Sequence, residues 1–202
     1  MILIIYDKRS GILAIRIFID QGHNPVGINA GAEGFGLQEQ DITYQVGIFL
    51  ANILNNDPRF IARTSRPSPT TSLGVSNTTS LAERVRLAND WPADYFISIH
   101  ANANDNPAIS GTEVYVYQAN SQPYWLAQRI LAEIVRRVGT KNNGVRLNPS
   151  LYVLRNTNMP SVLVELAYIS NASDAEKLKN NQYDFAYGIY NGLLDYFGFK
   201  AL

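Results

Sequence analysis

The chain contains only two histidines, and each follows or ends an apolar run that is typical of a β-strand. His23 comes shortly after the run 15–20 (IRIFID), and His100 is the last residue of the run 95–100 (YFISIH). In open α/β sheets, ligands bind outside the carboxyl ends of the strands. We therefore expect the two imidazoles to meet at one edge of a sheet, where any histidine chemistry of this chain must take place.

Two glutamates extend this set of side chains. Glu165 lies near the carboxyl end of a third apolar run, 161–166 (SVLVEL), which predicts a strand covered on both faces. Glu39 stands three residues before Ile42 and seven before Val46, so a helix that begins there places its carboxylate on the buried stripe. A carboxylate in that position is costly to bury unless it is paired or bound to a metal.

Together these groups predict a metal site. His23, Glu39 and His100 form a set of two histidines and one carboxylate, which suits a catalytic zinc with a fourth position open for water. Glu165 could then take a proton from that water and pass it to a leaving amine. Taken singly, the same residues could be structural histidines, a first-turn carboxylate favoured by the helix dipole, or a buried acid paired with an arginine. Their joint placement at one sheet edge favours the metal.

The elements that must position these residues follow a regular order. Short β-rich runs alternate with helical patterns along the 202 residues, which predicts a single α/β domain. We expect a twisted, mostly parallel sheet of about six strands with helices on both faces. The further strand candidates are 60–63, 111–117 and 151–154. The predicted helices are 39–54, 80–89 (with Ser80 and Glu83 as a capping box), 126–138 and 182–197.

Two segments differ from the rest in composition. Residues 1–14 begin with a short apolar run broken by charges, which predicts an N-terminal edge strand or hairpin rather than a signal peptide. We therefore expect no export route to be visible in this chain. Residues 64–79 (TSRPSPTTSLGVSNTT) are rich in Ser, Thr and Pro and are predicted to form a long loop.

Composition excludes several classes of function. Seventeen basic and seventeen acidic side chains cancel, so we expect neither nucleic acid nor a membrane surface as a partner. No cysteine is present, which excludes disulfides, thiol catalysis, iron–sulfur clusters and cysteine-bound zinc. No apolar stretch approaches the roughly 20 residues that span a bilayer. The apolar fraction of 46% is ordinary for a soluble globular protein, and the charged fraction of 17% is low.

Seven short motifs, read in order along the chain, carry a resemblance to a known family. They are Asp20-Gln21-Gly22-His23, Gly36-Leu37-Gln38-Glu39, Thr64-Ser65-Arg66, Leu81-Ala82-Glu83-Arg84, Ser98-Ile99-His100-Ala101-Asn102-Ala103, Leu151-Tyr152-Val153-Leu154-Arg155 and Pro160-Ser161-Val162-Leu163-Val164-Glu165-Leu166. With them, the chain between Ile17 and Phe197 resembles the zinc-dependent N-acetylmuramoyl-L-alanine amidases of the type-3 amidase family. The departures are small: Asn24 stands where a glycine is common, and Ala167-Tyr168 replaces the usual Gly-Phe.

The resemblance implies a function and a role for each candidate residue. It implies hydrolysis of the amide between N-acetylmuramic acid and L-alanine in peptidoglycan, at the bacterial cell wall. One Zn²⁺ per chain would be bound by His23, Glu39 and His100, and Glu165 would act as general base and then general acid. Peptidoglycan is the expected partner, and we expect the protein to be a monomer.

Four further residues have weaker signals. Asn102 could reach the substrate or cap a strand end, and Arg66 could bind a carboxylate of the stem peptide or be solvated on its loop. Arg84 could form a buried ion pair, and Asp20 could support a metal ligand or end its strand in a turn. Two other functions stay open: a zinc hydrolase of related fold that cuts a different amide, and a catalytically silent domain that binds the cell wall. Glu165 argues against the silent domain, because binding alone does not need it.

Overall fold

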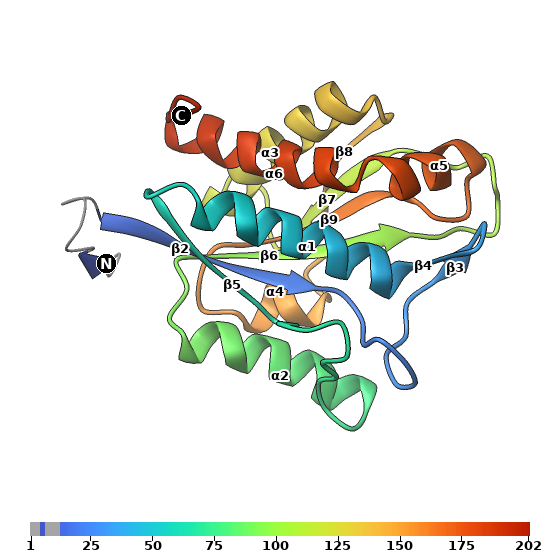
Figure 1. Ribbon diagram of the computed structural model, residues 1–202, viewed down its shortest axis with the longest axis horizontal. Helices are drawn as coiled ribbons and strands as arrows, with labels where there is room; N and C mark the ends of the chain where they lie inside the picture. The colour runs from blue at the N-terminus through green and yellow to red at the C-terminus, as the bar shows by residue number, and fades with distance from the viewer. Residues whose placement is uncertain (1–4, 7–12) are drawn as a thin grey trace.

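The structure is a computed structural model that describes residues 5–6 and 13–202, and its centre is a twisted seven-stranded sheet (Figure 1). The strands are β1 (Ile5–Tyr6), β2 (Leu13–Gln21), β5 (Phe60–Thr64), β6 (Tyr95–Asn102), β7 (Thr112–Val116), β8 (Asn142–Leu147) and β9 (Ser161–Tyr168). They lie in the order β1-β2-β6-β9-β7-β8, and β5 also pairs with β2. The strands β5, β2, β6 and β9 are parallel, whereas β7 runs antiparallel to β9 and parallel to β8. This arrangement confirms the predicted mostly parallel sheet.

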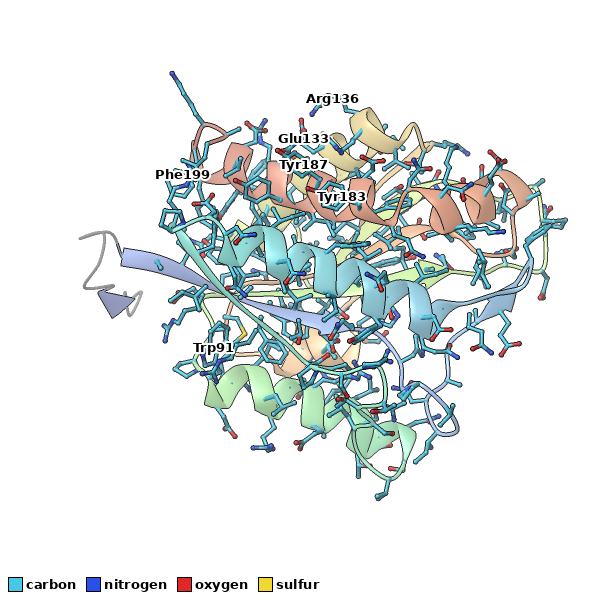
Figure 2. The ribbon with its side chains drawn as sticks, viewed as in Figure 1. Trp91, Glu133, Arg136, Tyr183, Tyr187 and Phe199 are labelled. Atoms are coloured by element: carbon cyan, nitrogen blue, oxygen red, sulfur yellow. The ribbon has the colours of Figure 1, made fainter. Side chains whose placement is uncertain are left out.

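Helices cover both faces of the sheet, as predicted (Figure 1). The larger layer contains α1 (Glu39–Asn55), α3 (Gln122–Val138), α5 (Ala172–Asn180) and α6 (Gln182–Phe197). The smaller layer contains α2 (Asn77–Asp90) and the short α4 (Tyr152–Asn156). A separate two-stranded sheet, β3 (Glu33–Gly34) and β4 (Leu37–Gln38), leads into α1. Side chains such as Tyr183, Tyr187, Glu133 and Arg136 cover the outside of the larger layer (Figure 2).

The alternation of side chains along the strands separates two hydrophobic cores. In β9, Val162 and Val164 belong to the core under the larger helix layer, whereas Leu163 packs in the smaller core with α2 and α4. Phe18 of β2 and Phe96 of β6 join Leu163 in the smaller core, and the two phenylalanine rings are stacked. Successive side chains of a strand point to opposite faces, so this parity assigns every later residue of these strands to one face.

The polar residues of the candidate site continue the face of the smaller core. Asp20, Ser98 and Glu165 each lie two residues beyond a core residue of their own strand, and His100 lies two beyond Ser98. All four therefore point to the same side of the sheet. This face is apolar where it is covered by α2 and α4, and polar at the carboxyl ends of the parallel strands.

One predicted strand is wrong. Residues 152–154 belong to helix α4 and Leu151 is its N-cap, whose carbonyl accepts a hydrogen bond from the Arg155 N–H at 3.1 Å. Val153 and Leu154 are buried in the smaller core. A run of four apolar residues fits either a strand or one helical turn, and packing against α2 decides for the helix.

Strand β8 is absent from the predicted strands. Its sequence, Asn-Asn-Gly-Val-Arg-Leu, lacks the alternation of polar and apolar residues that marks a half-buried strand. The strand forms because it pairs with β7, where Tyr115 lies opposite Arg146 and Val116 opposite Leu147. The pairing with β7 thus forms a strand that the local sequence does not predict.

Helix α2 begins earlier than predicted. Ser76 is its N-cap: the Ser76 side-chain oxygen accepts a hydrogen bond from the Thr79 N–H, and the Ser76 N–H donates to the Thr79 hydroxyl. The capping box is therefore formed by these two residues and not by Ser80 with Glu83. Because the helix starts inside it, the loop predicted over 64–79 is shorter than expected.

The prediction for residues 1–14 falls largely outside the described residues. Within them, Ile5 pairs with Ala14 and Tyr6 with Leu13 in an antiparallel ladder. Across residues 5–6 and 13–202, no helix combines the length and the apolar character that crossing a bilayer requires.

Candidate metal centre

Three chain segments bring His23, Glu39 and His100 together at the carboxyl edge of the sheet. His23 follows β2, Glu39 is the first residue of α1, and His100 lies in β6. His23 Nε2 and His100 Nδ1 each lie 3.0 Å from Glu39 Oε1, and the two nitrogens are 3.2 Å apart. The structure thus brings the three predicted ligands to one point.

The spacing of these three atoms fits a metal ion. In a tetrahedral zinc site with bonds of about 2.0–2.1 Å, neighbouring ligand atoms lie roughly 3.3 Å apart. His23 Nδ1 donates to the backbone oxygen of Asn29 at 3.2 Å, which leaves the lone pair of His23 Nε2 directed toward the other two ligands. Two imidazoles and a carboxylate form a donor set that suits zinc.

Glu39 is held as a carboxylate by its surroundings. Its Oε1 accepts a hydrogen bond from the Ala101 N–H at 3.0 Å, and its Oε2 accepts one from the Ala32 N–H at 2.9 Å. Burial opposes its ionisation, but hydrogen bonds and charge from the two imidazoles, led by His100, lower the pKa of Glu39 far below its ordinary value. Glu39 is therefore anionic at neutral pH, as a carboxylate ligand of a metal would be.

The turn between β2 and His23 is tightly constrained. A Cβ atom on Gly22 would lie 2.5 Å from His100 Cε1, so only a glycine lets the backbone approach this ring. His23 itself has a φ of 69°, a left-handed conformation that costs a residue other than glycine about 1 kcal/mol or more. The Thr43 hydroxyl of α1 donates to the Gly22 carbonyl at 2.7 Å. The turn is thereby fastened to the helix that carries Glu39.

Arg84 of α2 fastens the same turn from the other side. It is only 1% exposed, and its guanidinium donates to Asp20 Oδ1 and to the His23 carbonyl, both at 2.6 Å. The Ser98 hydroxyl donates to the other oxygen of Asp20 at 2.8 Å. Burial opposes the ionisation of Asp20, but the charge and hydrogen bond of Arg84, then the charge of His100 and the hydrogen bond of Ser98, lower its pKa. The buried ion pair predicted for Arg84 is confirmed, and Asp20 lies within β2 rather than in a turn.

Glu165 lies beside this cluster without a partner for one of its oxygens. In the strand ladders it is opposite His100 of β6 and Glu113 of β7. Its Oε2 is buried and has no hydrogen-bond partner among the described residues. Burial, followed by the negative charges of Glu39 and Glu113, raises the pKa of Glu165 well above its ordinary value. A carboxyl group so placed takes up a proton easily.

Comparison with known proteins places this chain in a family. The family model described as N-acetylmuramoyl-L-alanine amidase matches residues 17–195. The chain belongs to the N-acetylmuramoyl-L-alanine amidase family. The amidase CwlM of Bacillus licheniformis is 36% identical over 185 residues, which cover 89% of this chain and 67% of CwlM. The amidase LytC of Bacillus subtilis is 37% identical over 194 residues, covering 94% of this chain and 37% of LytC.

The fold agrees with a solved amidase. The crystal structure of N-acetylmuramoyl-L-alanine amidase from Clostridium difficile 630 matches with a TM-score of 0.81 and 32% sequence identity, over 93% of this chain and 99% of that chain. This chain thus spans about two thirds of CwlM and little more than a third of LytC, but nearly all of this solved amidase.

In this amidase fold, a hydrogen-bonded network that the sequence did not indicate surrounds Glu113. Glu113 is 4% exposed, and its Oε1 accepts hydrogen bonds from Asn102 (2.7 Å), Tyr168 (3.0 Å) and Tyr115 (3.1 Å). Arg146 lies 3.5 Å from its other oxygen. The one signal in the sequence was Glu113 itself, a charged residue in the middle of the predicted strand 111–117. A carboxylate inside a sheet needs hydrogen-bond partners, so its position alone could have indicated such a network.

The structure corrects the expectation for Arg66. Its side chain is 0% exposed, and its guanidinium donates to the backbone oxygens of Gln40 (2.9 Å) and Pro69 (3.2 Å). It is therefore neither solvated nor available to a stem-peptide carboxylate, because it holds its own loop against α1. Asn102 is half-buried, and its side-chain amide is engaged with Glu113 and with the Ala103 N–H. A contact of Asn102 with substrate stays a prediction.

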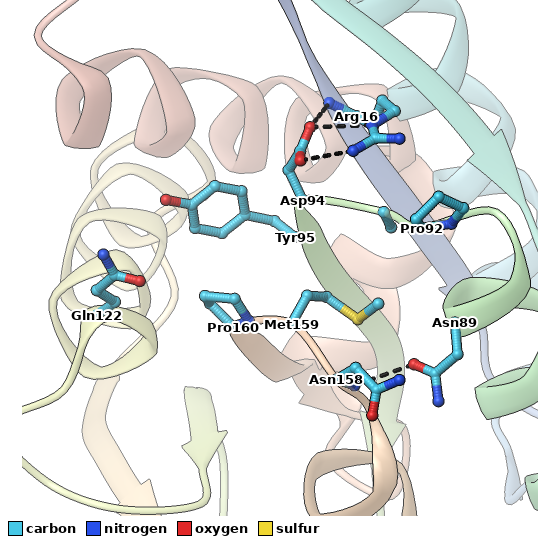
Figure 3. Close-up of a pocket in the computed structure, with 10 residues that line it drawn as sticks. Arg16, Asn89, Pro92, Asp94, Tyr95, Gln122, Asn158, Met159 and Pro160 are labelled. Atoms are coloured by element: carbon cyan, nitrogen blue, oxygen red, sulfur yellow. Dashed lines mark hydrogen bonds and ion pairs between the residues drawn. The ribbon is translucent and has the colours of Figure 1, made fainter. Parts of the chain in front are cut away.

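One cavity lies near the carboxyl ends of the parallel strands and another lies near their beginnings. A small one of about 120 Å³ adjoins the candidate site, and its lining includes His23, His100, Arg84 and Tyr152. A larger one of about 410 Å³ lies where β2 and β6 begin, near the ion pair of Arg16 with Asp94 (Figure 3). It is thus at the opposite edge of the sheet from the histidines. Both histidines line the smaller cavity, whereas Glu39 and Glu165 are not among its lining residues.

Proposed function

We propose that this chain hydrolyses the amide bond between N-acetylmuramic acid and L-alanine in peptidoglycan. The observation that carries this proposal is the convergence of His23 Nε2, His100 Nδ1 and Glu39 Oε1 within 3.0–3.2 Å, beside the unpartnered carboxyl group of Glu165, in a member of this family. One Zn²⁺ per chain would be held by the three converging atoms. When bound, zinc would polarise the amide carbonyl and bring the pKa of a water molecule toward neutrality.

Glu165 performs the proton transfers of this reaction. Its carboxylate takes a proton from the attacking water and later gives a proton to the departing nitrogen of L-alanine. Burial and the neighbouring carboxylates raise its pKa, so the protonated form is held long enough to act as an acid. Its unpartnered Oε2 leaves a lone pair free for that proton.

The surrounding residues orient the ligands. The Asn29 carbonyl sets the tautomer of His23, the Ala32 and Ala101 N–H groups orient Glu39, and Arg84 holds the carbonyl of His23. Such contacts around a metal site typically change metal affinity or activity 10- to 100-fold when they are lost. The protein is expected to act as a monomer on peptidoglycan at the bacterial cell wall.

The test is a digest of purified bacterial peptidoglycan with the zinc-loaded protein, read by mass spectrometry. We expect intact stem peptides with a new amino terminus on L-alanine, together with glycan strands of unchanged length. Cleavage inside the stem peptide would assign the site to a different amide, and the absence of any cleavage by protein with zinc bound would contradict the proposed activity.

A further inference from the structure

Arg146 of β8 is an exposed cation beside the buried carboxylate of Glu113. Its side chain is 55% exposed, and its Nε lies 3.5 Å from Glu113 Oε2. Among residues 5–6 and 13–202, the structure gives the two terminal nitrogens of Arg146 no hydrogen-bond partner. Since a guanidinium has five donors in a fixed fork, the edge formed by these two nitrogens is free for a bidentate contact with a carboxylate.

The strand register places Arg146 on the face of the sheet that carries Glu165. Arg146 is opposite Tyr115, which is two residues from Glu113, and Glu113 is opposite Glu165. Opposite residues of paired strands point to the same face, so Arg146 and Glu165 share one face of the sheet. With strands about 4.8 Å apart and an offset of two residues along the strands, the Cα atoms of Arg146 and Glu165 lie roughly 12 Å apart. The contact of Arg146 Nε with Glu113 Oε2 at 3.5 Å brings the guanidinium closer to Glu165 than this backbone separation.

Tyr115 gives independent support for this proximity. Its hydroxyl donates to Glu113 Oε1 at 3.1 Å. Burial, together with the charges of Glu113 and Glu165, raises the pKa of Tyr115 to about 12, while the charge of Arg146 acts in the opposite sense. The two carboxylates and the arginine therefore all lie within electrostatic reach of one hydroxyl group.

We propose that Arg146 binds a carboxylate of the stem peptide, carried by the residue that follows L-alanine. This inference rests on the proposed function, because it takes the substrate to be peptidoglycan. In the stem, the residue after L-alanine is linked through its side-chain carboxyl, so its α-carboxyl is either free or amidated. An extended peptide advances about 3.4 Å per residue, which puts this group some 6–9 Å from the scissile nitrogen. A guanidinium held against Glu113, the residue opposite Glu165, is within reach of a group at that distance.

The charges around the site give a second argument for a contact between Arg146 and the substrate carboxylate. Glu113 and Glu165 repel an anionic substrate, and an amide of the same shape would not be repelled. The positive charge of Arg146 offsets this repulsion. It thereby makes binding of the free carboxylate more favourable than binding of the amide. Glu113 Oε1 already accepts three hydrogen bonds, so Oε2 is the oxygen that faces Arg146. Glu113 thereby orients the guanidinium for this role.

The test compares two soluble muramoyl tripeptides that differ only in the α-carboxyl of the second residue, which is free in one and amidated in the other. For the native enzyme we expect kcat/KM to be roughly 10- to 100-fold higher on the free carboxylate. In Arg146→Gln this preference disappears through a loss on the carboxylate substrate, and Arg146→Lys retains part of it. The matched control is Arg136→Gln, an exposed arginine on the outside of α3 (Figure 2), which keeps the native preference.

A native enzyme without preference, or an Arg146→Gln variant that keeps it, would overturn the proposal. A binding measurement separates this failure from failure of the proposed function. In calorimetry, Glu165→Gln should bind the free-carboxylate tripeptide at least tenfold more tightly than Glu165→Gln combined with Arg146→Gln. That result without any hydrolysis by the native protein would retain the carboxylate site and reject the amidase activity, whereas equal binding by both variants would overturn the role of Arg146.

Discussion

Glu165 differs from an ordinary exposed glutamate in every feature that a proton carrier needs. It is flanked in the sheet by His100 and Glu113, and its Oε2 has no hydrogen-bond partner among the described residues. Its pKa is raised by burial and by the charges of Glu39 and Glu113. A catalytic base works best when its pKa is near the working pH, and these surroundings shift Glu165 in that direction.

At this scale we predict that Glu165→Gln abolishes hydrolysis and keeps the metal. An amide cannot take up the proton, so kcat on a soluble muramoyl peptide should fall by roughly 10²- to 10⁴-fold. The zinc content, measured by mass spectrometry of the protein solution, should stay at one per chain because the three ligands are untouched. Glu133→Gln on the outer face of α3 is the control. A fully active Glu165→Gln enzyme would remove this residue from the mechanism.

At the scale of elements, the ion pair of Arg84 and Asp20 joins α2 to β2 and, through Ser98, to β6. Arg84 also donates to the carbonyls of Gln21 and His23, so the turn that presents the first histidine depends on it. Both partners of the pair are 1% exposed. Removing one partner of a buried pair leaves the other charge without compensation, which is far more costly than losing a surface pair.

We therefore predict that Asp20→Asn lowers the free energy of unfolding of the metal-free protein by about 3–5 kcal/mol at pH 7. The pKa of Asp20 is lowered in the folded state, so its contribution is complete above the unfolded value of about 3.9 and is lost as the pH falls below it. Urea unfolding at several pH values should show the difference shrinking in acid.

The control for this prediction is Asp90→Asn, which removes an exposed partner of Arg86 on the same helix. This change should alter the free energy of unfolding by less than about 1 kcal/mol. An equal loss of stability in the two variants at pH 7 would contradict the contribution to the free energy of unfolding that is predicted for the buried pair.

At the scale of the whole molecule, the candidate metal centre joins segments that are distant in the chain. The three ligands come from the turn after β2, the start of α1 and the end of β6. An ion that binds only when these segments are in place stabilises the folded state through that binding. A metal ion held by these three residues would thus link segments that are far apart in the chain.

We predict that zinc at 100 times its Kd raises the free energy of unfolding by about 2.7 kcal/mol, and that a chelator reverses the gain. His100→Ala removes one ligand, so the same zinc concentration should leave its unfolding midpoint unchanged. The measurement is denaturant unfolding with and without the metal. An equal gain in native protein and in His100→Ala would show that zinc binds elsewhere.

Part of the site could be predicted because its signals are local. His23, Glu39, His100 and Glu165 stand next to strand ends or at a helix start, and parallel strands bring such positions to one edge whatever the details of packing. The role expected for Arg66 was wrong, because its burial depends on carbonyl groups that α1 and its own loop bring to it. No local pattern distinguishes a buried loop arginine from a solvated one.

The sequence by itself determined the α/β class, the order of most elements and the grouping of the metal ligands. These features follow from hydrophobic periodicity and from side chains at element ends, which act over a few residues. Only the tertiary structure decided that 152–156 is a helix, that β8 exists, and that Glu113 lies opposite Glu165 with Arg146 beside it. The physical reason is that packing against α2 and the registers of β7 with β8 and β9 join segments far apart in the chain, so their energies are absent from any local stretch of sequence.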